Sequence, residues 1–318
     1  ANNNTIVAGS FIGTADFDPG SSVASLTAGP QGNGFIAKYD AAGNFLWAKN
    51  LLATSVMIIL DFALDNNGNI FVGGYFNDTC DFDPGNPVAN LVSGSNGSDM
   101  FIAKYDNNGN YLWANKFGGT DDLDQVERIV TDDSGNVIVT GGFKGTVDFD
   151  PGAGTYNLVN GNFNSEYFFA KYDGSGNLIW AKHIASQKLY TDIAVKNNNV
   201  YLCGSFNQTV DFDPGSGTAN LSVGSAYSWF FAKYDSAGNY VYAKYLNNSS
   251  GTSNLIYGGN GIAIDDNENT YLFGNFTTTV DFDPGAGTAN LTASLSTAMY
   301  LAKYDATGNY LWAKNLDI

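Results

Sequence analysis

The 318-residue sequence predicts an all-β fold, and specifically a five-bladed β-propeller built from four-stranded antiparallel blades. The first observation is a repeat: the pentapeptide Asp-Phe-Asp-Pro-Gly occurs five times without substitution, at intervals of 65, 67, 63 and 70 residues. Such a period is typical of repeat architectures. The second observation is that short β-branched and aromatic runs alternate with Gly, Asn and Asp clusters, while no segment has sustained helical periodicity.

The third repeat shows the elements of one blade most clearly. Turns are predicted at 132–136 and 173–177, where Asp and Asn accompany Gly. The pentapeptide and a Gly- and Asn-rich connection separate the second strand from the third. Four short strands, a to d, are predicted at 126–131, 137–143, 166–172 and 178–184.

One four-stranded sheet cannot bury both of its faces, but five sheets stacked around an axis can do so against their neighbours. Each predicted strand d has a large aromatic residue at a fixed position, and each strand c ends in tyrosine. A parallel β-helix is disfavoured because the strand–turn–strand units are typical of hairpins. The aromatic series are Trp47, Trp113, Trp180, Tyr242 and Trp312, and Tyr39, Tyr105, Tyr172, Tyr234 and Tyr304.

We predict a single propeller domain over residues 1–318, with repeats at approximately 1–52, 53–118, 119–186, 187–247 and 248–318. The first repeat starts at strand b, residues 5–11, so its blade lacks an inner strand in this chain. This suggests a fragment or processed form of a longer chain. The open edge also predicts strand exchange or self-assembly at the first blade.

The composition limits the classes of partner that the chain is expected to bind. The net charge is −17, from 31 acidic and 14 basic residues, and it opposes binding to nucleic acid. No apolar run reaches the roughly 20 residues of a membrane span, so membrane insertion is not expected. Cys80 and Cys203 occupy different positions of non-adjacent repeats, which predicts small buried apolar side chains and no disulfide.

The pentapeptides contain the candidate site residues. Pro-Gly predicts a type II turn, and the phenylalanine is expected in the core, with both aspartates on the other side. Either the carboxylates accept backbone N–H groups of the long b–c connection, or each pair binds a hard cation such as Ca²⁺. The aspartates are Asp16, Asp18, Asp81, Asp83, Asp148, Asp150, Asp211, Asp213, Asp281 and Asp283.

The predicted turns sort onto two faces of a propeller. All five c–d turns have the pattern Asp-x-x-Gly-Asn, and the a–b turns have it except in the fourth repeat, which has Lys196–Asn199, and the fifth, which has Glu268 in place of Gly. Hairpin chemistry explains this pattern without a metal. The pentapeptides and the variable d–a loops lie on the opposite face, where we expect protein or glycan to bind. On it, Tyr227 and Trp229 are the aromatic candidates for contact with a ligand.

The sequence does not predict an enzyme. His183 lies at an outward position of strand d, and no nucleophile elbow or phosphate-binding loop is present. Five identical aspartate pairs favour a structural role over glycoside chemistry, because an active site normally breaks repeat symmetry. The asymmetric segments 121–124 and 247–259 are interpreted as solvated loops.

Segments such as Ala63–Phe76 and the recurring Ala-Lys-Tyr-Asp-x-x-Gly-Asn pattern resemble the bacterial β-propeller repeat family called SBBP, and the Asp-Phe-Asp-Pro-Gly repeats resemble those of secreted Bacteroidota proteins. The resemblance covers essentially the whole chain. It implies a secreted or cell-surface module, in a setting that often includes type 9 secretion. We therefore expect a non-catalytic module that binds or adheres to glycan or protein. The alternatives are a structural subunit of a surface filament or secretion complex, and a polysaccharide-acting enzyme.

Overall fold

The computed structural model describes residues 3–85, 88–94, 97–119, 124–161, 165–187, 190–248, 261–294 and 296–316. Every regular element among them is a β-strand, which confirms the all-β prediction. None of these residues belongs to a helix with the length and hydropathy that crossing a membrane would require. The chain divides into two compact units, Ala1–Asn160 with Ala170–Ala181, and Gly161–Phe169 with Lys182–Ile318.

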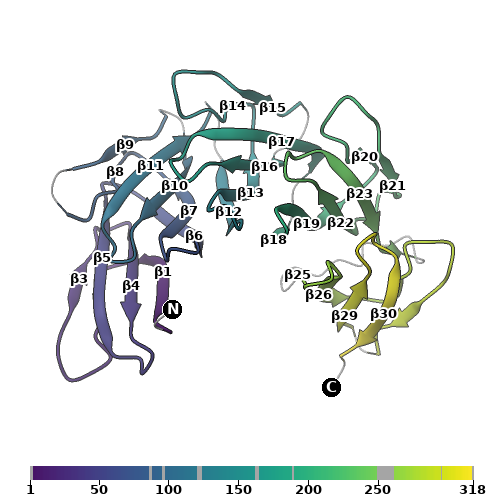
Figure 1. Ribbon diagram of the computed structural model, residues 1–318, viewed down its shortest axis with the longest axis horizontal. Coiled ribbons are helices and arrows are strands. Elements are labelled where there is room, and N and C mark those ends of the chain that lie inside the picture. The colour runs from purple at the N-terminus through teal and green to yellow at the C-terminus, as the bar shows by residue number, and fades with distance from the viewer. Residues whose placement is uncertain are drawn as a thin grey trace. The chain divides into compact units, whose positions relative to one another are not determined.

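The first unit contains the first two repeats and most of the third (Figure 1). The first repeat forms β1 (Thr5–Phe11), β2 (Thr14–Asp16), β3 (Ser25–Thr27), β4 (Asn33–Tyr39) and β5 (Phe45–Ala53). The second forms β6 (Met57–Leu64), β7 (Ile70–Phe76), β8 (Thr79–Asp81), β9 (Asn90–Val92), β10 (Asp99–Tyr105) and β11 (Tyr111–Phe117). Their main sheets have the orders β1-β4-β5 and β6-β7-β10-β11.

The third repeat forms β12 (Gln125–Thr131), β13 (Val137–Phe143), β14 (Thr146–Asp148), β15 (Asn157–Val159), β16 (Glu166–Tyr172) and β17 (Leu178–Gln187). Its main sheet is β12-β13-β16-β17. All four strands predicted for this repeat are present. Strand d is longer than expected, because β17 continues to Gln187 where a loop was predicted from residue 185.

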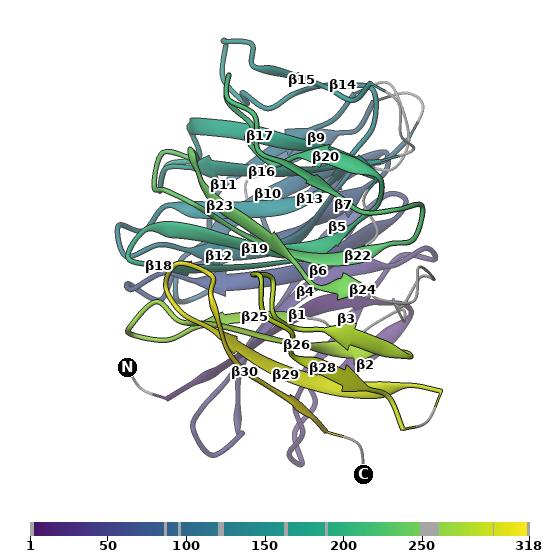
Figure 2. The same cartoon turned by 90° about the vertical axis from the view of Figure 1, so that its right-hand side faces the viewer.

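The second unit contains the main sheets of the fourth and fifth repeats (Figure 2). Their orders are β18-β19-β22-β23 and β25-β26-β29-β30. The fourth repeat forms β18 (Thr191–Lys196), β19 (Asn199–Phe206), β20 (Thr209–Asp211), β21 (Asn220–Ser222), β22 (Ser228–Tyr234) and β23 (Tyr240–Tyr245), followed by β24 (Asn247–Asn248). The fifth forms β25 (Gly261–Ile264), β26 (Thr270–Phe276), β27 (Thr279–Asp281), β28 (Asn290–Thr292), β29 (Ala298–Tyr304) and β30 (Tyr310–Asn315).

These antiparallel four-stranded sheets, each formed by one repeat, are consistent with the blades of a β-propeller. Pairing follows chain order from a to d, as in a meander. The first repeat differs as predicted: among the described residues β1 is an edge strand that pairs with β4 alone.

The b–c connections contain a second element that the sequence analysis did not predict. Each forms a small hairpin of two three-residue strands, such as β8 with β9 and β20 with β21. The last residue of the first small strand is the first aspartate of the pentapeptide. Two of these hairpins also pair with the preceding repeat: Asp81 lies opposite Leu52 of β5, and Asp281 lies opposite Asn247 of β24. These two hairpins therefore connect successive repeats, in addition to linking strands b and c of their own repeat.

The hydrophobic core lies between successive sheets. In the first unit, Ile36 and Leu51 of the first repeat pack with Met57 and Val72 of the second. In the second unit, the Phe231 ring of the fourth repeat lies 4.5 Å, centroid to centroid, from the Tyr304 ring of the fifth. Stacking of the repeats thus buries sheet faces that one repeat could not bury alone. Cys80 and Cys203 are free and buried, as predicted.

Three of the large aromatic residues of strand d, Trp47, Trp113 and Tyr242, pack against the next repeat. Trp47 contacts Gly109 in the c–d turn of the second repeat so closely that an added Cβ would lie 2.9 Å from its ring. Trp113 donates its indole N–H to the Gly174 carbonyl at 3.2 Å. Tyr242 is in the same position against Gly308. Glycine at this turn position supplies a positive φ and also leaves room for the aromatic ring.

Gly109→Ala is expected to destabilise the protein more than Gly43→Ala. Both glycines have a positive φ in a c–d turn, +75° and +85°, so both substitutions incur backbone strain of about 1–2 kcal/mol. Only at Gly109 would the new methyl group meet Trp47, which adds about 1–3 kcal/mol. Urea unfolding of the two variants measures the difference directly, and equal losses would contradict the packing role of this glycine.

Candidate functional site

The pentapeptide aspartates accept backbone N–H groups of their own hairpin. Asp81 Oδ1 accepts from Asp83 N at 3.1 Å and from Ala89 N at 2.8 Å, and Asp83 Oδ1 accepts from Gly85 N at 2.8 Å. The other four copies repeat this pattern with distances of 2.7–3.1 Å. The structure therefore places the two aspartates of each pair in one loop, where they accept backbone N–H groups, as the first of the two interpretations of the sequence predicts. The first aspartate spans the loop, and the second closes a turn.

The Pro-Gly step does not form the predicted type II turn. That turn requires a positive φ at glycine, and none of the five pentapeptide glycines has one. Instead the second aspartate accepts from the amide two residues later, which is an Asx-turn. Glycine still fits best here, because a Cβ on Gly215 would lie 3.0 Å from Asp213 Oδ1. Sequence reasoning predicted a turn here and the aspartate acceptors, but the turn type that it inferred from Pro-Gly is wrong.

The phenylalanine between the two aspartates anchors the hairpin to the main sheet. Phe82 is fully buried, and its ring centroid lies 5.6 Å from that of Phe76 and 4.9 Å from that of Phe101. Phe149, Phe212 and Phe282 are equally buried, whereas Phe17 is only partly buried in the three-stranded first sheet. The expectation that this residue enters the core is thus confirmed for four repeats.

A tyrosine hydroxyl completes each pentapeptide. Tyr105, the last residue of β10, donates its O–H to the Phe82 carbonyl at 2.8 Å. The equivalent pairs have distances of 2.9–3.1 Å and join Tyr39 to Phe17, Tyr172 to Phe149, Tyr234 to Phe212, and Tyr304 to Phe282. Burial raises the pKa of Tyr105, and the charges of Tyr111, Asp83 and Asp81 add to this, so the hydroxyl stays protonated and can donate. Sequence reasoning had placed these tyrosines at the end of strand c without finding their partner.

The structure does not test the calcium prediction. Among the described residues there is no group of three or more His, Cys, Asp or Glu side chains arranged to hold a metal ion. Each pentapeptide supplies only two carboxylates, and one oxygen of each already accepts a backbone amide. Hard cations such as Ca²⁺ take six to eight oxygen ligands. The pairs would therefore need several backbone carbonyls or waters to complete a site.

The Asp-x-x-Gly-Asn turns have the hairpin chemistry that was predicted. Asp132 Oδ1 accepts from Ser134 N and Asn136 N at 2.9 Å each, and Asp132 Oδ2 accepts from Asn136 Nδ2. Burial works against ionisation of this carboxyl, but hydrogen bonds from Lys171 and Asn136 outweigh it and lower its pKa. At Asp305, desolvation is likewise outweighed by donors from Asn309 and Thr307, and the pKa falls to about 2. These turns thus hold ionised carboxylates for structural reasons.

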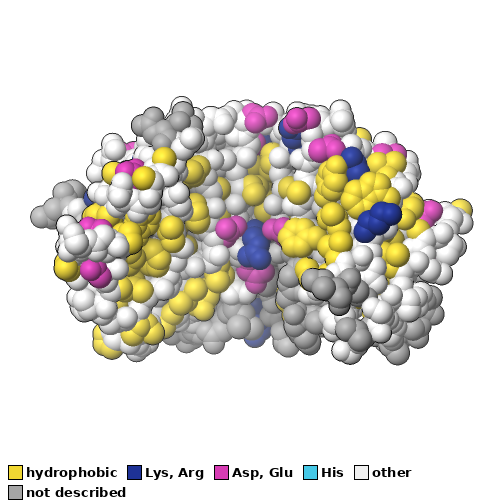
Figure 3. All heavy atoms as spheres, turned by 90° about the horizontal axis from the view of Figure 1, so that it is seen from below, with side chains coloured by type: hydrophobic (Ala, Val, Ile, Leu, Met, Phe, Trp, Pro, Cys, Tyr) yellow, Lys and Arg dark blue, Asp and Glu magenta, His cyan; other side chains and the backbone are white. Residues whose placement is uncertain are grey.

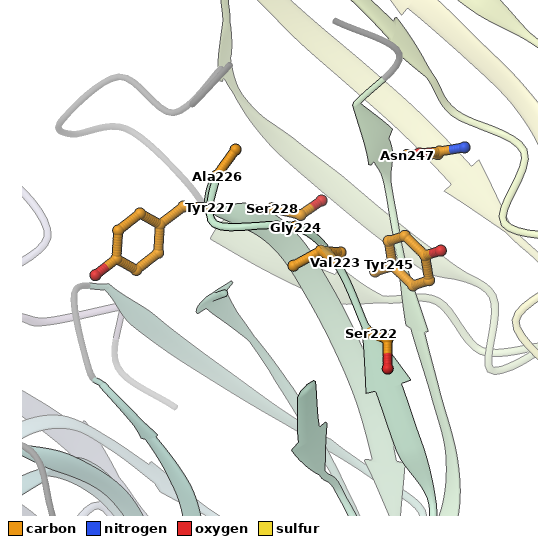
Figure 4. Close-up of a pocket in the computed structure, with 8 residues that line it drawn as sticks. All are labelled: Ser222, Val223, Gly224, Ala226, Tyr227, Ser228, Tyr245 and Asn247. Carbon is orange, nitrogen blue, oxygen red and sulfur yellow. The ribbon is translucent and has the colours of Figure 1, made fainter. Parts of the chain in front are cut away.

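The face with the pentapeptide connections contains a small cavity in the fourth repeat. Its volume is about 270 Å³. It is lined by Ser222, Val223, Gly224, Ala226, Tyr227, Ser228, Tyr245 and Asn247 (Figure 4). These residues come from the end of β21, the start of β22 and the segment from β23 to β24. The lining combines hydroxyl, amide and aromatic groups with no charged side chain.

The two aromatic residues predicted to contact a ligand on this face, Tyr227 and Trp229, differ in exposure. Tyr227 is partly exposed, lines the cavity, and donates its hydroxyl to Gln187 Oε1 at 2.6 Å. Trp229 is 6% exposed and belongs to the core between the fourth and fifth repeats. The proposal that Trp229 contacts a ligand is therefore wrong, because Trp229 lies within β22, all of whose residues are buried. Tyr245, which the sequence analysis did not select, lines the cavity instead.

The cavity lies beside a position that differs among the repeats. The first residue of strand c faces a residue of strand d: Asn33 donates to Asn50 Oδ1 at 2.8 Å, and Lys116 pairs with Asp99 at 2.7 Å. In the fourth repeat the small Ser228 takes the place of Asp99. Repeat comparison could have found this position, since a different residue stands there in each of the five copies.

His183 is the strand-d residue of this pair in the third repeat, and Glu166 is the first residue of strand c that it faces. It is partly buried and lies 3.8 Å from Glu166, which is 2% exposed. Desolvation lowers the pKa of His183, so the imidazole is neutral at pH 7. The expectation of a surface residue is corrected in part, because His183 faces a buried carboxylate within its own sheet.

The two asymmetric segments lie largely outside the described residues, namely 121–123 of the acidic segment and 249–260 of the long insertion. Asp124 of the acidic segment is described: it is buried and accepts hydrogen bonds from Gly119 N and Lys144 N.

Comparisons with known proteins find similarity to a WD-repeat protein. No family model matches the chain. It is 25% identical, over an alignment of 339 positions, to the uncharacterized WD repeat-containing protein L264 of Acanthamoeba polyphaga mimivirus. The alignment covers 88% of this chain but only 24% of that protein. A crystal structure of a protein of unknown function from Bacteroides caccae aligns with a TM-score of 0.32 and 12% identity, covering 88% of this chain and 89% of that one.

We expect Asp81→Ala to destabilise the protein by about 1–3 kcal/mol, because it leaves two hairpin amides without their acceptor. Asp81→Asn keeps a side-chain oxygen and should recover most of that loss. Melting curves with millimolar Ca²⁺ and with chelator provide the control. A melting temperature that rises with Ca²⁺ only when Asp81 is intact would show that a cation, rather than the backbone bonds alone, stabilises this loop.

The protein is expected to lose stability in acid below about pH 4. A carboxyl with a pKa below its ordinary 3.8, such as Asp305 at about 2, stabilises the fold above pH 4, and this contribution is lost as the pH falls through 2. The stability difference between the wild type and Asp305→Asn should therefore shrink between pH 4 and pH 2. Chemical unfolding across this range measures it, and a constant difference would refute the assignment.

Proposed function

We propose that the chain is a non-catalytic binding module, a five-bladed propeller that presents a ligand site on the face of its b–c connections. Five equivalent repeats support the propeller arrangement, together with the packing of the first sheet on the second and of the fourth on the fifth, and so does the similarity to a WD-repeat protein. The non-catalytic assignment is supported by the pentapeptides, whose carboxylates serve the backbone in the same way five times.

The ligand we propose is a neutral glycan bound at the cavity of the fourth repeat. The observation that carries this proposal is the cavity itself, where Ser228 replaces a larger acidic residue and Tyr245 forms one wall (Figure 4). Hydroxyl and amide groups suit the donors and acceptors of a sugar, and an aromatic ring suits its apolar face. About 270 Å³ is near the lower end of ligand pockets, so the cavity fits a small terminal unit.

The resemblance to secreted Bacteroidota repeats supports a secreted or cell-surface location, and a surface module of this kind would meet glycans there. The alternative function, a structural subunit of a surface filament or secretion complex, is favoured by a different observation. β1 is an edge strand among the described residues, and such an edge can pair with a strand of a partner.

Tyr245→Ala is expected to weaken glycan binding by at least about tenfold, because removing the ring removes a wall of the cavity. Tyr156→Ala is the control for loss of a tyrosine ring, since Tyr156 is exposed and lies on the hairpin loop of the third repeat, away from the cavity lining. Binding is measured on a glycan array and then by calorimetry with the strongest neutral glycan. If Tyr245→Ala folds poorly, Asn247→Ala tests the same cavity. An array without signal for the wild type, or equal binding by all variants, would reject the glycan proposal.

A further inference from the structure

The fourth repeat lacks the aspartate that follows strand a in its neighbours. In the second, third and fifth repeats this aspartate pairs with the lysine of strand c. The pairs are Lys104 with Asp65 at 3.6 Å, Lys171 with Asp132 at 2.8 Å, and Lys303 with Asp265 at 3.3 Å. In the fourth repeat, Asn197 and Asn198 join β18 to β19 and both have a positive φ, +51° and +60°, as in a two-residue type I′ turn. This turn has no carboxylate for Lys233, the equivalent lysine.

Glu268 of the fifth repeat supplies the carboxylate instead. Its Oε2 accepts from Lys233 Nζ at 2.5 Å and from the Tyr201 hydroxyl at 3.0 Å, and its Oε1 accepts from Asn197 Nδ2 at 2.7 Å. All three donors belong to the fourth repeat. The hydrogen bonds from Lys233 and Asn197 lower the pKa of Glu268, so the carboxylate is ionised at neutral pH. One repeat thus provides the acceptor that the preceding repeat lacks.

The backbone of Glu268 is in a conformation that disfavours a side chain. Its φ is +59°, and the equivalent residues of the second and third repeats are Gly68 and Gly135, both with a φ of +77°. The turn of the fifth repeat does not need the glutamate, because Asp265 already accepts two backbone amides of that turn at 2.9 and 3.0 Å. Such strain persists only where the surroundings compensate for it. Here the compensation comes from the three donors of the fourth repeat.

A glutamate at this position would not suit the boundary between the second and third repeats. Lys104 of the second repeat donates to the Gly174 carbonyl of the third at 2.9 Å, and Gly174 lies next to Gly135, since an added Cβ on it would be 3.3 Å from the Gly135 carbonyl. A glutamate in place of Gly135 would therefore approach Lys104. That lysine already has Asp65 as its partner, so the second carboxylate would meet a like charge.

Opposite charges also meet elsewhere at the boundary between the fourth and fifth repeats. Lys196 Nζ lies 2.5 Å from Asp266 Oδ1, which places the two a–b turns side by side (Figure 2). Figure 3 shows basic and acidic side chains beside one another on the part of the surface that the C-terminal repeats form. The Asp266 side chain is 96% exposed, so this second ion pair contributes little. Glu268, whose side chain is 21% exposed, is the stronger contact.

We propose that Lys233, Tyr201 and Asn197 form a carboxylate-binding site on the fourth repeat that selects the fifth repeat, through Glu268, as the one that packs against it. Repeats that share the same pentapeptide and turns can pack in a wrong order while the chain folds. Attraction at the correct boundary and repulsion at an incorrect one distinguish such partners. The fourth repeat therefore recognises a following repeat with a glutamate at this turn position, and rejects none of the packing that the other repeats share.

The first test is a double-mutant cycle in the full chain. Glu268→Gln keeps two polar atoms but removes the charge, and it should raise the equilibrium constant of unfolding about tenfold, as expected for loss of a charge-assisted hydrogen bond. Lys233→Met should cause a similar loss, and the double variant should lose little more than either. Urea unfolding measures the losses, and hydrogen exchange of β18 and β25 locates them. If Lys233→Met does not fold, Tyr201→Phe takes its place in the cycle.

Asp266→Asn is the matched control, because it removes an exposed carboxylate of the same turn and should change the constant less than twofold. Glu268→Gly restores the usual turn residue and relieves the backbone strain, yet it should still destabilise the protein. Additive losses in the cycle, or a Glu268→Gly variant as stable as the wild type, would overturn the proposal.

The second test moves the glutamate to another boundary. Gly135→Glu has room for the new side chain, since an added Cβ meets no atom within 4 Å, but it should destabilise the protein because Lys104 already has Asp65. With Asp65→Asn in the same chain, Lys104 is free for the new carboxylate, and the effect of Gly135→Glu should become about tenfold smaller. An equal effect in both backgrounds would show that charge does not select the following repeat.

Discussion

The structure depends on one recurring interaction, the acceptance of backbone N–H groups by an aspartate carboxylate. In the pentapeptides it folds the b–c connection into a hairpin, and in the a–b and c–d turns it closes the tight reversal between strands. Loops of this length would otherwise leave many amides without a defined partner. The strongly acidic composition therefore has a structural origin, since the carboxylates of the pentapeptides and of the Asp-x-x-Gly-Asn turns accept backbone N–H groups.

The packing between successive repeats depends on the turns that these aspartates hold in a defined shape. A turn with a defined shape presents its glycine to the aromatic residue of the preceding strand d, as Gly109 does to Trp47 and Gly176 to Trp113. The lysine of strand c adds a polar contact at the same boundary, for example from Lys104 to the Gly174 carbonyl. Local turn chemistry and packing between sheets are thus two consequences of the same sequence pattern.

Much of the fold could be predicted from the sequence, because strands, turns and the repeat period all leave strong local patterns. The small hairpins were missed since strands of three residues, such as Thr79–Asp81, are too short for a periodicity. The bonds from Tyr105 to Phe82 could not be inferred either, as they join two recurring residues whose proximity only folding reveals. For the candidate site, loop variability predicts the binding face, and this stays a prediction. Trp229 was placed on that face wrongly, because it lies within β22, all of whose residues are buried.

The tyrosine–carbonyl contact has a consequence for how such a chain forms. Tyrosine and phenylalanine of each pair are only 22 or 23 positions apart, and the aspartate bonds span eight or fewer. Contacts of such short sequence separation lower the contact order and favour rapid folding. A repeat emerging from the ribosome can therefore close its own hairpin before the next repeat is synthesised. The same autonomy allows gene duplication to add a repeat without redesigning those already present.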